Sequence, residues 1–411
     1  MNYFINKIHI NKLFHLNNVD IPIEKKKYPH LIITGKNGSG KTVLLNAIAD
    51  FLNQIKDKAN LNFLQYRESL LSLQKRQNKC HDQIERMQNK QFIDNYQRWI
   101  DDLYGKVDIS IANIGNIIEK YKEELFIITF YQADRKIIMS EPKNPTKPVY
   151  KKKGDVKETA TSQFLNFLSD LKIQEALARN EQQIKDADDI KAWFTDFEGL
   201  LKQIYQDENL KLEFNYKDYS FKICSEGKKF KFTEVSDGFA AILDIVADLI
   251  LKMQNDNSVT RSYQKEGIVL IDEIETHLHL ELQKLIMPLL TKVFPNIQFI
   301  ITTHSPFVLS SMPDAVAYDL ERKVILDDLT EYSYESLAEG YFGVNTASSY
   351  AEMQLETLKR LLEKNELTDA DKVEIKQLKT EFEKTSEVFS PLSIGEYRQL
   401  VIQNSEILNN L

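Results

Sequence analysis

The first part of the chain alternates between apolar and polar residues. The apolar positions are Tyr3, Ile5, Ile8 and Ile10, followed by a second set at residues 19–23. A period of two is typical of strands that bury one face and expose the other. We therefore predict two half-exposed strands at the start of the chain.

Four later stretches are apolar almost throughout, at residues 31–33, 124–131, 268–271 and 297–301. Short runs of this kind predict strands that are buried on both faces. Apolar residues at helical spacing follow the first of them. Strands that alternate with helices favour a parallel sheet with helices on its faces, and hence an α/β fold.

Other segments carry different patterns. Residues 60–121 are polar and helix-like without heptads, which predicts a helical insertion such as a short hairpin. Residues 135–157 hold three prolines and eight basic residues against two acidic ones, which predicts an extended basic loop. Further helices are expected over 161–205, an antiparallel ribbon over 210–232, and two charged helices at 351–363 and 369–384.

Composition limits the class of protein. The chain has 411 residues, 42% of them hydrophobic, and a formal net charge of -8, which is an ordinary soluble composition. It has only Cys80 and Cys224, so a disulfide framework or a cysteine-based zinc site is not expected. No apolar run is long enough to cross a membrane. We expect a cytoplasmic protein with no membrane partner.

A glycine-rich loop lies between the predicted strand at 31–33 and the helix after it. Residues 35–42 match the pattern G-x-x-x-x-G-K-[ST], in which backbone N–H groups face phosphate oxygens. Lys41 is expected to reach the β- and γ-phosphates of ATP, and Thr42 to hold Mg²⁺. The predicted nucleotide contacts are Gly35, Asn37, Gly38, Ser39, Gly40, Lys41, Thr42 and Val43.

Two acidic residues end the predicted strand at 268–271. Asp272 is placed to hold Mg²⁺, and Glu273 to polarise the attacking water as a general base. A strand capped by a polar loop is the alternative. His304 follows the strand at 297–301 and is a candidate γ-phosphate contact, because neighbouring parallel strands end at the same edge of a sheet. A structural histidine is the alternative there.

A fourth motif precedes an apolar helix at residues 240–251. Ser236 is a good N-cap, and the loop from Ser236 to Gly238 could present N–H groups to an anion. An ordinary helix cap is the alternative interpretation of this segment.

Together the four motifs resemble the ATP-binding-cassette (ABC) ATPases. The resemblance implies an ABC-type ATPase head with a mixed sheet and helices, a helical insertion and a helical C-terminal tail. It makes Gln132 the residue of the glutamine loop, which senses Mg²⁺ and the γ-phosphate. Ser236 and Gly238 stand in the signature position, which in this family contacts ATP bound by a second subunit, so it implies a homodimer or higher homo-oligomer with ATP at the interface.

The match is nearest to the stand-alone RecF, OLD and SMC-like branch. Residues 270–279, with the sequence LIDEIETHLH, and residues 301–306, with the sequence ITTHSP, resemble segments of that branch. The implied head comprises 1–59, 122–135 and 205–345, with a helical insertion at 60–121, a basic loop and helical subdomain at 136–204, and a helical tail at 346–411. His277 and His279 are expected to be structural or dimer-contact residues, because two ligands do not make a zinc site.

Residues 333–344 resemble the ATPase subunits of bacterial anti-phage defence systems such as Septu, PARIS and the retron-associated pairs. That resemblance implies a sensor or scaffold ATPase with a separate effector protein, often a nuclease. A second hypothesis is a DNA-repair or chromosome-maintenance ATPase that contacts DNA phosphates through the basic loop, at Lys143, Lys147, Lys151, Lys152 and Lys153. A transporter nucleotide-binding subunit is the third, and the insertion and the signature both argue against it.

Overall fold

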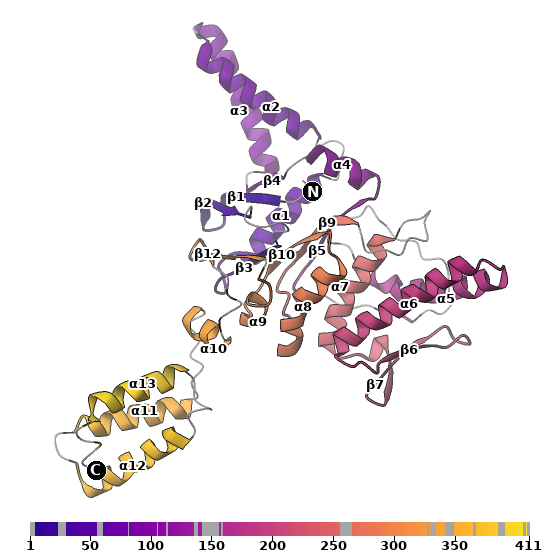
Figure 1. Cartoon of the computed structure of the whole chain (residues 1–411). Helices are drawn as coiled ribbons and strands as arrows, with labels where there is room; N and C mark the ends of the chain where they lie inside the picture. Colours follow the sequence, from indigo (N-terminus) through magenta and orange to yellow (C-terminus); the bar gives the residue numbers. More distant parts are fainter. Residues whose placement is uncertain are drawn as a thin grey trace. The chain divides into compact units, whose positions relative to one another are not determined.

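A computed structural model describes most of the chain (Figure 1). The described residues are 5–23, 30–55, 61–80, 82–104, 106–111, 114–134, 139–141, 156–157, 159–254, 265–313, 315–326, 329, 332, 334–341, 349–364, 367–384, 391–405 and 408. They fall into two compact units, residues 1–330 and residues 331–411. The second unit includes the short helical segments at Tyr334–Ser336 (α10) and Leu337–Tyr341 (η4), which precede the tail expected at 346–411.

A six-stranded sheet forms the centre of the first unit, in the order β12-β11-β3-β10-β9-β5. Every neighbouring pair is parallel except β11 and β12, so the sheet is mixed and the predicted α/β fold class is confirmed. The strands are β3 (His30–Thr34), β5 (Phe126–Tyr131), β9 (Glu266–Ile271), β10 (Ile297–Thr302), β11 (Ala315–Asp319) and β12 (Val324–Leu326). The apolar runs of β3 and β10 are buried throughout, as expected of central strands covered on both faces.

A second, antiparallel sheet has the order β2-β1-β4. The alternating N-terminal pattern forms β1 (Ile5–Leu13) and β2 (Leu16–Pro22), as predicted. The third strand, β4 (Val107–Ile111), pairs with β1 and lies within the stretch expected to be wholly helical, so that expectation is wrong at this point. Its buried Val107 and Ile109 join the same apolar core as the central sheet.

The remaining part of residues 60–121 is helical. Helices α2 (Leu61–Lys79) and α3 (Gln83–Tyr104) run side by side as a hairpin, with Arg76 and Glu85 forming an ion pair at 2.7 Å (Figure 1). Helix α4 (Ile114–Lys122) then leads into β5. The predicted helical hairpin is therefore present. Strand β3 of the central sheet precedes it along the chain, and β4 of the second sheet follows it.

A helical subdomain follows β5 along the chain. It consists of η2 (Thr161–Gln163), α5 (Phe164–Asn180) and α6 (Ile184–Tyr205), with Trp193 stacked on Phe197 at 5.4 Å between ring centroids. The predicted ribbon is a three-stranded antiparallel sheet of β6 (Lys211–Phe214), β7 (Phe221–Ser225) and β8 (Lys228–Lys231). The turn η3 (Phe232–Glu234) connects it to α7 (Asp237–Met253), and α8 (Leu280–Val293) and α9 (Pro306–Leu309) flank the later strands. The basic loop from Lys143 to Lys153 lies outside the described residues.

The second unit is a small helical bundle of α11 (Ser349–Leu362), α12 (Asp369–Lys384) and α13 (Pro391–Gln403). The first two helices were predicted. The third was missed, because its apolar residues do not follow one helical stripe. Phe382 and Tyr397 stack at 4.9 Å between α12 and α13, and so close the core of this unit.

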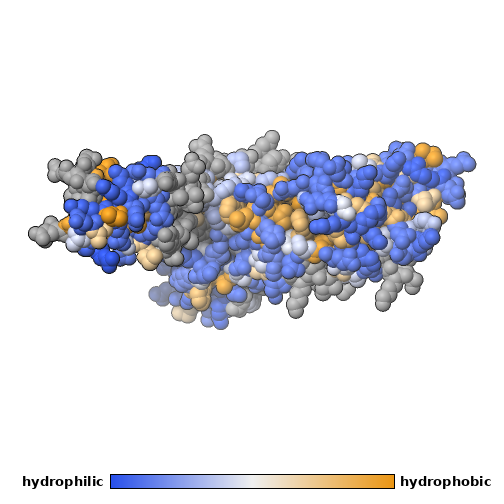
Figure 2. All heavy atoms as spheres, turned by 90° about the horizontal axis from the view of Figure 1, so that it is seen from below, coloured by the Kyte–Doolittle hydropathy of each residue, from blue (hydrophilic) through white to orange (hydrophobic). Residues whose placement is uncertain are grey.

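In the part of the chain that the structure describes, no helix is both long enough and apolar enough to span a membrane. Figure 2 shows a largely hydrophilic surface on the face seen from below, with hydrophobic residues in patches between the hydrophilic ones.

Candidate ATP-binding and hydrolysis site

Three neighbouring strand ends of the central sheet bring the predicted site residues to one edge. Strand β3 continues into the glycine loop, β10 into Thr303 and His304, and β9 into Asp272 and Glu273. These strands are parallel neighbours, so all three segments leave the sheet at their carboxyl ends. That edge is where open α/β sheets bind ligands.

The glycine loop has the backbone that phosphate binding requires. Gly35, Gly38 and Gly40 have φ values of 137°, 81° and 96°, a region that side chains disfavour. Space is also tight at the first of them, because a Cβ on Gly35 would lie 3.0 Å from the Ser39 hydroxyl. That hydroxyl is buried and has no hydrogen-bond partner among the described residues. The loop thus curls tightly and holds a polar group available to an anion.

Lys41 is the first residue of helix α1 (Lys41–Ile55), and its side chain is buried. Its ammonium donates hydrogen bonds to the carbonyl oxygens of Gly35 at 2.9 Å and Lys36 at 3.1 Å. Burial lowers the pKa of this ammonium, and the nearby carboxylates of Glu273 and Glu275 act in the opposite direction. The positive charge therefore lies inside the loop and faces the acidic end of β9.

Thr42 and Val43 follow in the first turn of α1, and both are exposed. The Asn46 side-chain amide donates to the Thr42 backbone carbonyl at 2.8 Å. The Thr42 hydroxyl takes no part in this hydrogen bond. The hydroxyl of Thr42 and the carboxylate of Asp272 are oxygen donors of the kind that Mg²⁺ prefers, so the residues present fit this ion.

Asp272 and Glu273 are held by Thr302 at the end of β10. The Thr302 hydroxyl donates to Asp272 Oδ1 at 2.6 Å and accepts the Glu273 N–H at 2.8 Å. Asp272 is almost wholly buried, whereas Glu273 is partly exposed. Glu273 also adopts a positive φ of 43°, an uncommon backbone for a side chain of this size and frequent at functional sites. The two carboxylates thus differ in their exposure to solvent.

His304 lies at the end of the adjacent segment and is half-buried. Burial and the Lys41 ammonium both lower the pKa of its imidazole below the usual range, with Asp272 opposing them. His304 therefore shares an electrostatic environment with the glycine loop and the strand β9. Its contact with the γ-phosphate stays a prediction.

Glu275 is a residue whose part in this site the sequence did not reveal. Its carboxylate accepts the Thr303 hydroxyl at 2.8 Å and the His304 N–H at 2.5 Å. Burial raises the pKa of this carboxyl, against the lowering effect of these hydrogen bonds. Glu275 is therefore a positioning residue for His304. The sequence included Glu275 in the segment at 270–279 but suggested no role for it.

Gln132 comes directly after β5, on the far side of β9 from β10. Tyr131 and Ile271 are register partners, and the Asp272 N–H donates to the Tyr131 carbonyl at 2.8 Å. Gln132 follows Tyr131 and therefore lies near Asp272 at the same edge of the sheet. It is exposed. The structure therefore places Gln132 next in the chain to a residue that is hydrogen-bonded to Asp272, and its expected part in sensing Mg²⁺ and the γ-phosphate stays a prediction.

The predicted signature residues lie at the start of α7. Ser236 is the N-cap residue, yet its hydroxyl makes no capping hydrogen bond. A Cβ on Gly238 would lie 2.8 Å from the carbonyl oxygen of His277, so this glycine allows α7 to pack closely on the segment after Glu273. Among the described residues no hydrogen bond joins Ser236 or Gly238 to the glycine loop.

An aromatic pair beside the glycine loop was also missed. A Cβ on Gly40 would lie 3.5 Å from Leu16 and 3.9 Å from the His15 ring, so the turn between β1 and β2 borders the loop. In that turn the Phe14 and His15 rings meet edge to face at 5.2 Å, and Phe14 has a positive φ of 57°. Both residues are exposed. A turn between two strands carried no chemical signal in the sequence.

The mixed sheet, the glycine loop and the acidic strand end are together the features of a P-loop nucleotide-binding fold. Residues 133–310 match the family described as "AAA domain, putative AbiEii toxin, Type IV TA system". That stretch includes Ser236, Asp272, Glu273 and His304. Over these residues, which make up less than half of its length, the chain is similar to this family, and it is also similar to Septu PtuA and to the retron ATPases.

Two curated relatives illustrate this relationship. The Septu protein PtuA of Bacillus mycoides is 42% identical over 94 residues, which cover 23% of this chain and 13% of that protein. The Retron Vc95 probable ATPase of Vibrio cholerae is 28% identical over 252 residues, which cover 59% of this chain and 44% of that protein. The matches therefore span less than half the length of these relatives.

Among solved structures, the head domain of an SMC protein bound to the C-winged helix domain of ScpA is similar to this chain. It has a TM-score of 0.39 and 13% sequence identity, with 79% of this chain and 97% of that chain covered.

Proposed function

We propose that the chain hydrolyses ATP with Mg²⁺ and that ATP joins two copies head to tail. The observation that carries the proposal is the convergence of the glycine loop, Asp272, Glu273 and His304 at the carboxyl ends of three adjacent parallel strands. Thr42 and Asp272 would hold Mg²⁺, which when bound supplies positive charge against the phosphates.

The remaining residues divide the chemistry between them. Lys41 would exchange its hydrogen bonds to Gly35 and Lys36 for phosphate oxygens, since it already lies within the loop. Glu273 would take the proton of the attacking water, and its N–H bond to Thr302 fixes its position. His304, kept neutral by its lowered pKa, can accept or donate a hydrogen bond at the γ-phosphate.

Dimerisation is supported by the position of the signature. Ser236 is the N-cap residue of α7 and Gly238 lies in its first turn, and neither makes a hydrogen bond with the glycine loop among the described residues. We infer that they complete the site of a second copy, with α7 contributing its positive N-terminal end to the γ-phosphate. Because Gly238 packs on His277, the signature of one copy would be coupled to its own Glu273 strand.

The test compares the wild-type chain with Glu273→Gln and Lys41→Ala, by measuring phosphate release and sedimentation with and without Mg-ATP. We expect Glu273→Gln to hydrolyse ATP at least about 100-fold more slowly, because general-base catalysis contributes about that much, and to accumulate as a dimer. Lys41→Ala should neither hydrolyse ATP nor dimerise. The exposed Glu281→Gln is a matched control and should behave as wild type.

Turnover by Glu273→Gln at the wild-type rate would refute the general-base assignment. A monomer that persists in Glu273→Gln with saturating Mg-ATP would refute the head-to-tail dimer. The two readouts therefore test separate parts of the proposal.

We further propose that this ATPase acts as a sensor or scaffold in anti-phage defence, together with a separate effector protein such as a nuclease. The support is the relationship to Septu PtuA and to the retron ATPases. Co-expression with the product of the neighbouring gene should protect cells from phage, and Lys41→Ala should remove the protection. Equal protection by Lys41→Ala would count against a role for ATP in defence.

A further inference from the structure

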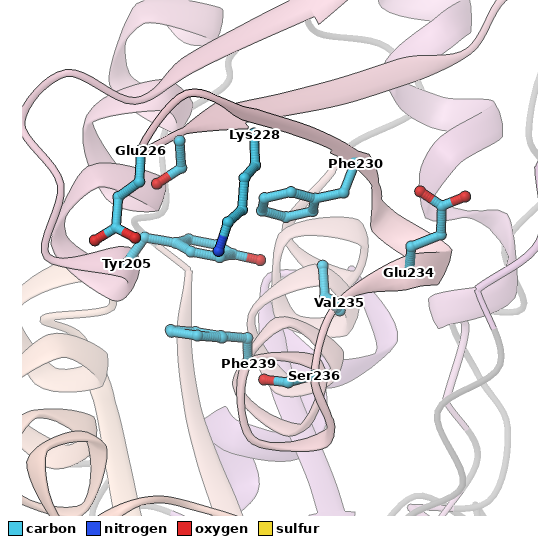
Figure 3. A pocket seen from close by; sticks show the side chains of 9 residues that line it. Tyr205, Glu226, Lys228, Phe230, Glu234, Val235, Ser236 and Phe239 are labelled. Carbon is cyan, nitrogen blue, oxygen red and sulfur yellow. The ribbon is translucent and has the colours of Figure 1, made fainter.

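A pocket of about 390 Å³ lies beside the signature and is not used by the chemistry described above. Its walls come from the end of α6, the β7–β8 turn, β8 and the start of α7 (Figure 3). Three aromatic rings line it. Tyr205 stacks on Phe239 at 4.2 Å between centroids, and Phe230 lies 5.9 Å from Tyr205. Ser236 lines the same pocket, so the pocket adjoins the predicted nucleotide interface.

The pocket is suited to an aromatic ring with a polar neighbour. The Tyr205 hydroxyl is buried and has no hydrogen-bond partner among the described residues. Burial raises the pKa of this hydroxyl well above its usual value, so it stays protonated and can donate. The rim carries the carboxylates of Glu226 and Glu234 and the ammonium of Lys228. An occupant therefore needs an apolar ring, a hydrogen-bond acceptor beside it, and positive charge at its edge.

The turn between β1 and β2 offers these three features. Phe14 is 75% exposed, and its backbone has a left-handed φ of 57°. His15 lies against it and supplies ring nitrogens. The exposed Lys12 precedes them on β1. Within one copy this turn does not reach the pocket, since β1–β2 and β6–β7 lie well apart in the first unit (Figure 1).

Head-to-tail association would bring the two features together. The Phe14 turn borders the glycine loop at Gly40, and the pocket borders the signature at Ser236. In a two-fold dimer, any contact between the loop side of one copy and the signature side of the other occurs twice. The exposed ring and the aromatic pocket then face each other at both ends of the interface.

We propose that Phe14 of each copy enters the pocket formed by Tyr205, Phe230 and Phe239 of the other copy when ATP joins them. This inference rests on the proposed head-to-tail dimer. His15 accepts the hydrogen bond of the Tyr205 hydroxyl, and Lys12 approaches the rim carboxylates. Buried aromatic anchors dominate the energy of protein interfaces. Phe14→Ala therefore weakens the ATP-dependent dimer at least about tenfold, since a truncated anchor typically costs that much.

The contact can be tested by cross-linking in the full chain. Cys80→Ser and Cys224→Ser remove the native thiols, and Glu273→Gln keeps ATP bound. Phe14→Cys and Val235→Cys then place one thiol on the turn and one on the pocket wall, for a short bismaleimide reagent. We expect a covalent dimer with Mg-ATP and monomers without it.

A matched control uses Tyr216→Cys in place of Phe14→Cys. Tyr216 lies between β6 and β7 and is a similarly exposed aromatic residue, at 73%. It should give no ATP-dependent cross-link with Val235→Cys. Sedimentation of Phe14→Ala, in an otherwise native Glu273→Gln chain, measures the tenfold weakening without any cysteine.

The outcomes separate this inference from the proposed function. A dimer with Mg-ATP that neither cross-links through position 14 nor weakens in Phe14→Ala overturns the contact and leaves the dimer intact. Failure of Glu273→Gln itself to dimerise overturns the proposed function, and the contact with it. An ATP-dependent cross-link together with a weaker Phe14→Ala dimer supports both.

Discussion

Asp248 joins strand β5, which ends at Tyr131, to helix α7, which begins at the signature. Its side chain on α7 is wholly buried and accepts three hydrogen bonds. The donors are the Tyr131 hydroxyl at 2.7 Å, the Lys252 ammonium at 2.6 Å and the Ala160 N–H at 2.7 Å. Burial and the Asp248 charge both raise the pKa of Tyr131, so its hydroxyl stays a donor. Removing the carboxylate would take away the acceptor that these three donors share.

We expect Asp248→Ala to lower the free energy of unfolding by about 3–5 kcal/mol, because breaking a buried ion pair leaves the other charge uncompensated. The isosteric Asp248→Asn retains one acceptor oxygen and should cost less, about 1–3 kcal/mol. Asp188→Ala is the control. Its carboxylate is 61% exposed and pairs with Arg179 at 3.1 Å, so its loss should cost about 0–1 kcal/mol.

Equilibrium unfolding in urea, followed by tryptophan fluorescence, measures these differences in the free energy of unfolding for the first unit. The chain has two tryptophans, Trp99 and Trp193, and both belong to the first unit. The signal is therefore independent of the C-terminal bundle. If Asp248→Ala unfolded within 1 kcal/mol of the wild type, which is the range expected of the surface control, the buried network would not contribute as argued.

Two further predictions use the same assay. Gly238→Ala should lower stability by about 1–3 kcal/mol, because the new methyl group would lie 2.8 Å from the rigid backbone carbonyl of His277. Gly199→Ala in α6, where a Cβ meets nothing within 4 Å, should instead raise it by about 0.5–1 kcal/mol, and equal signs for the two would contradict the packing argument. His304 has a lowered pKa in the folded chain, so the stability that it contributes is present above pH ~6.5 and is lost as the pH falls through the folded value. The stability of His304→Gln should therefore fall less than that of the wild type on acidification, and parallel pH curves would contradict this.

The residues of the central site could be predicted because their signals are local. Each apolar run is short and continuous, and the polar residues that follow it mark the strand end, so β3, β9 and β10 were expected close to their observed bounds. Parallel strands that end at one edge bring those residues together without further information.

The features that were missed depend on packing between distant parts of the chain. Strand β4 is only five residues long and lies between polar helices, and it forms because β1 offers a free edge. The pocket beside the signature exists because Tyr205, at the end of α6, stacks on Phe239 of α7. The pairing of Glu275 with the His304 backbone likewise requires two neighbouring strands to be in register.

The position of β3 in the central sheet has a consequence for how the protein is made. Its hydrogen-bonded neighbours are β10 and β11, which the ribosome synthesises only after the helical hairpin, the aromatic subdomain and the signature helix. Long-range parallel pairing forms slowly, because the entropy of closing a large loop must be overcome first. The strand that leads into the glycine loop therefore remains without these partners through most of translation, and a chain cut short before residue 297 lacks β10 and cannot complete the proposed nucleotide site.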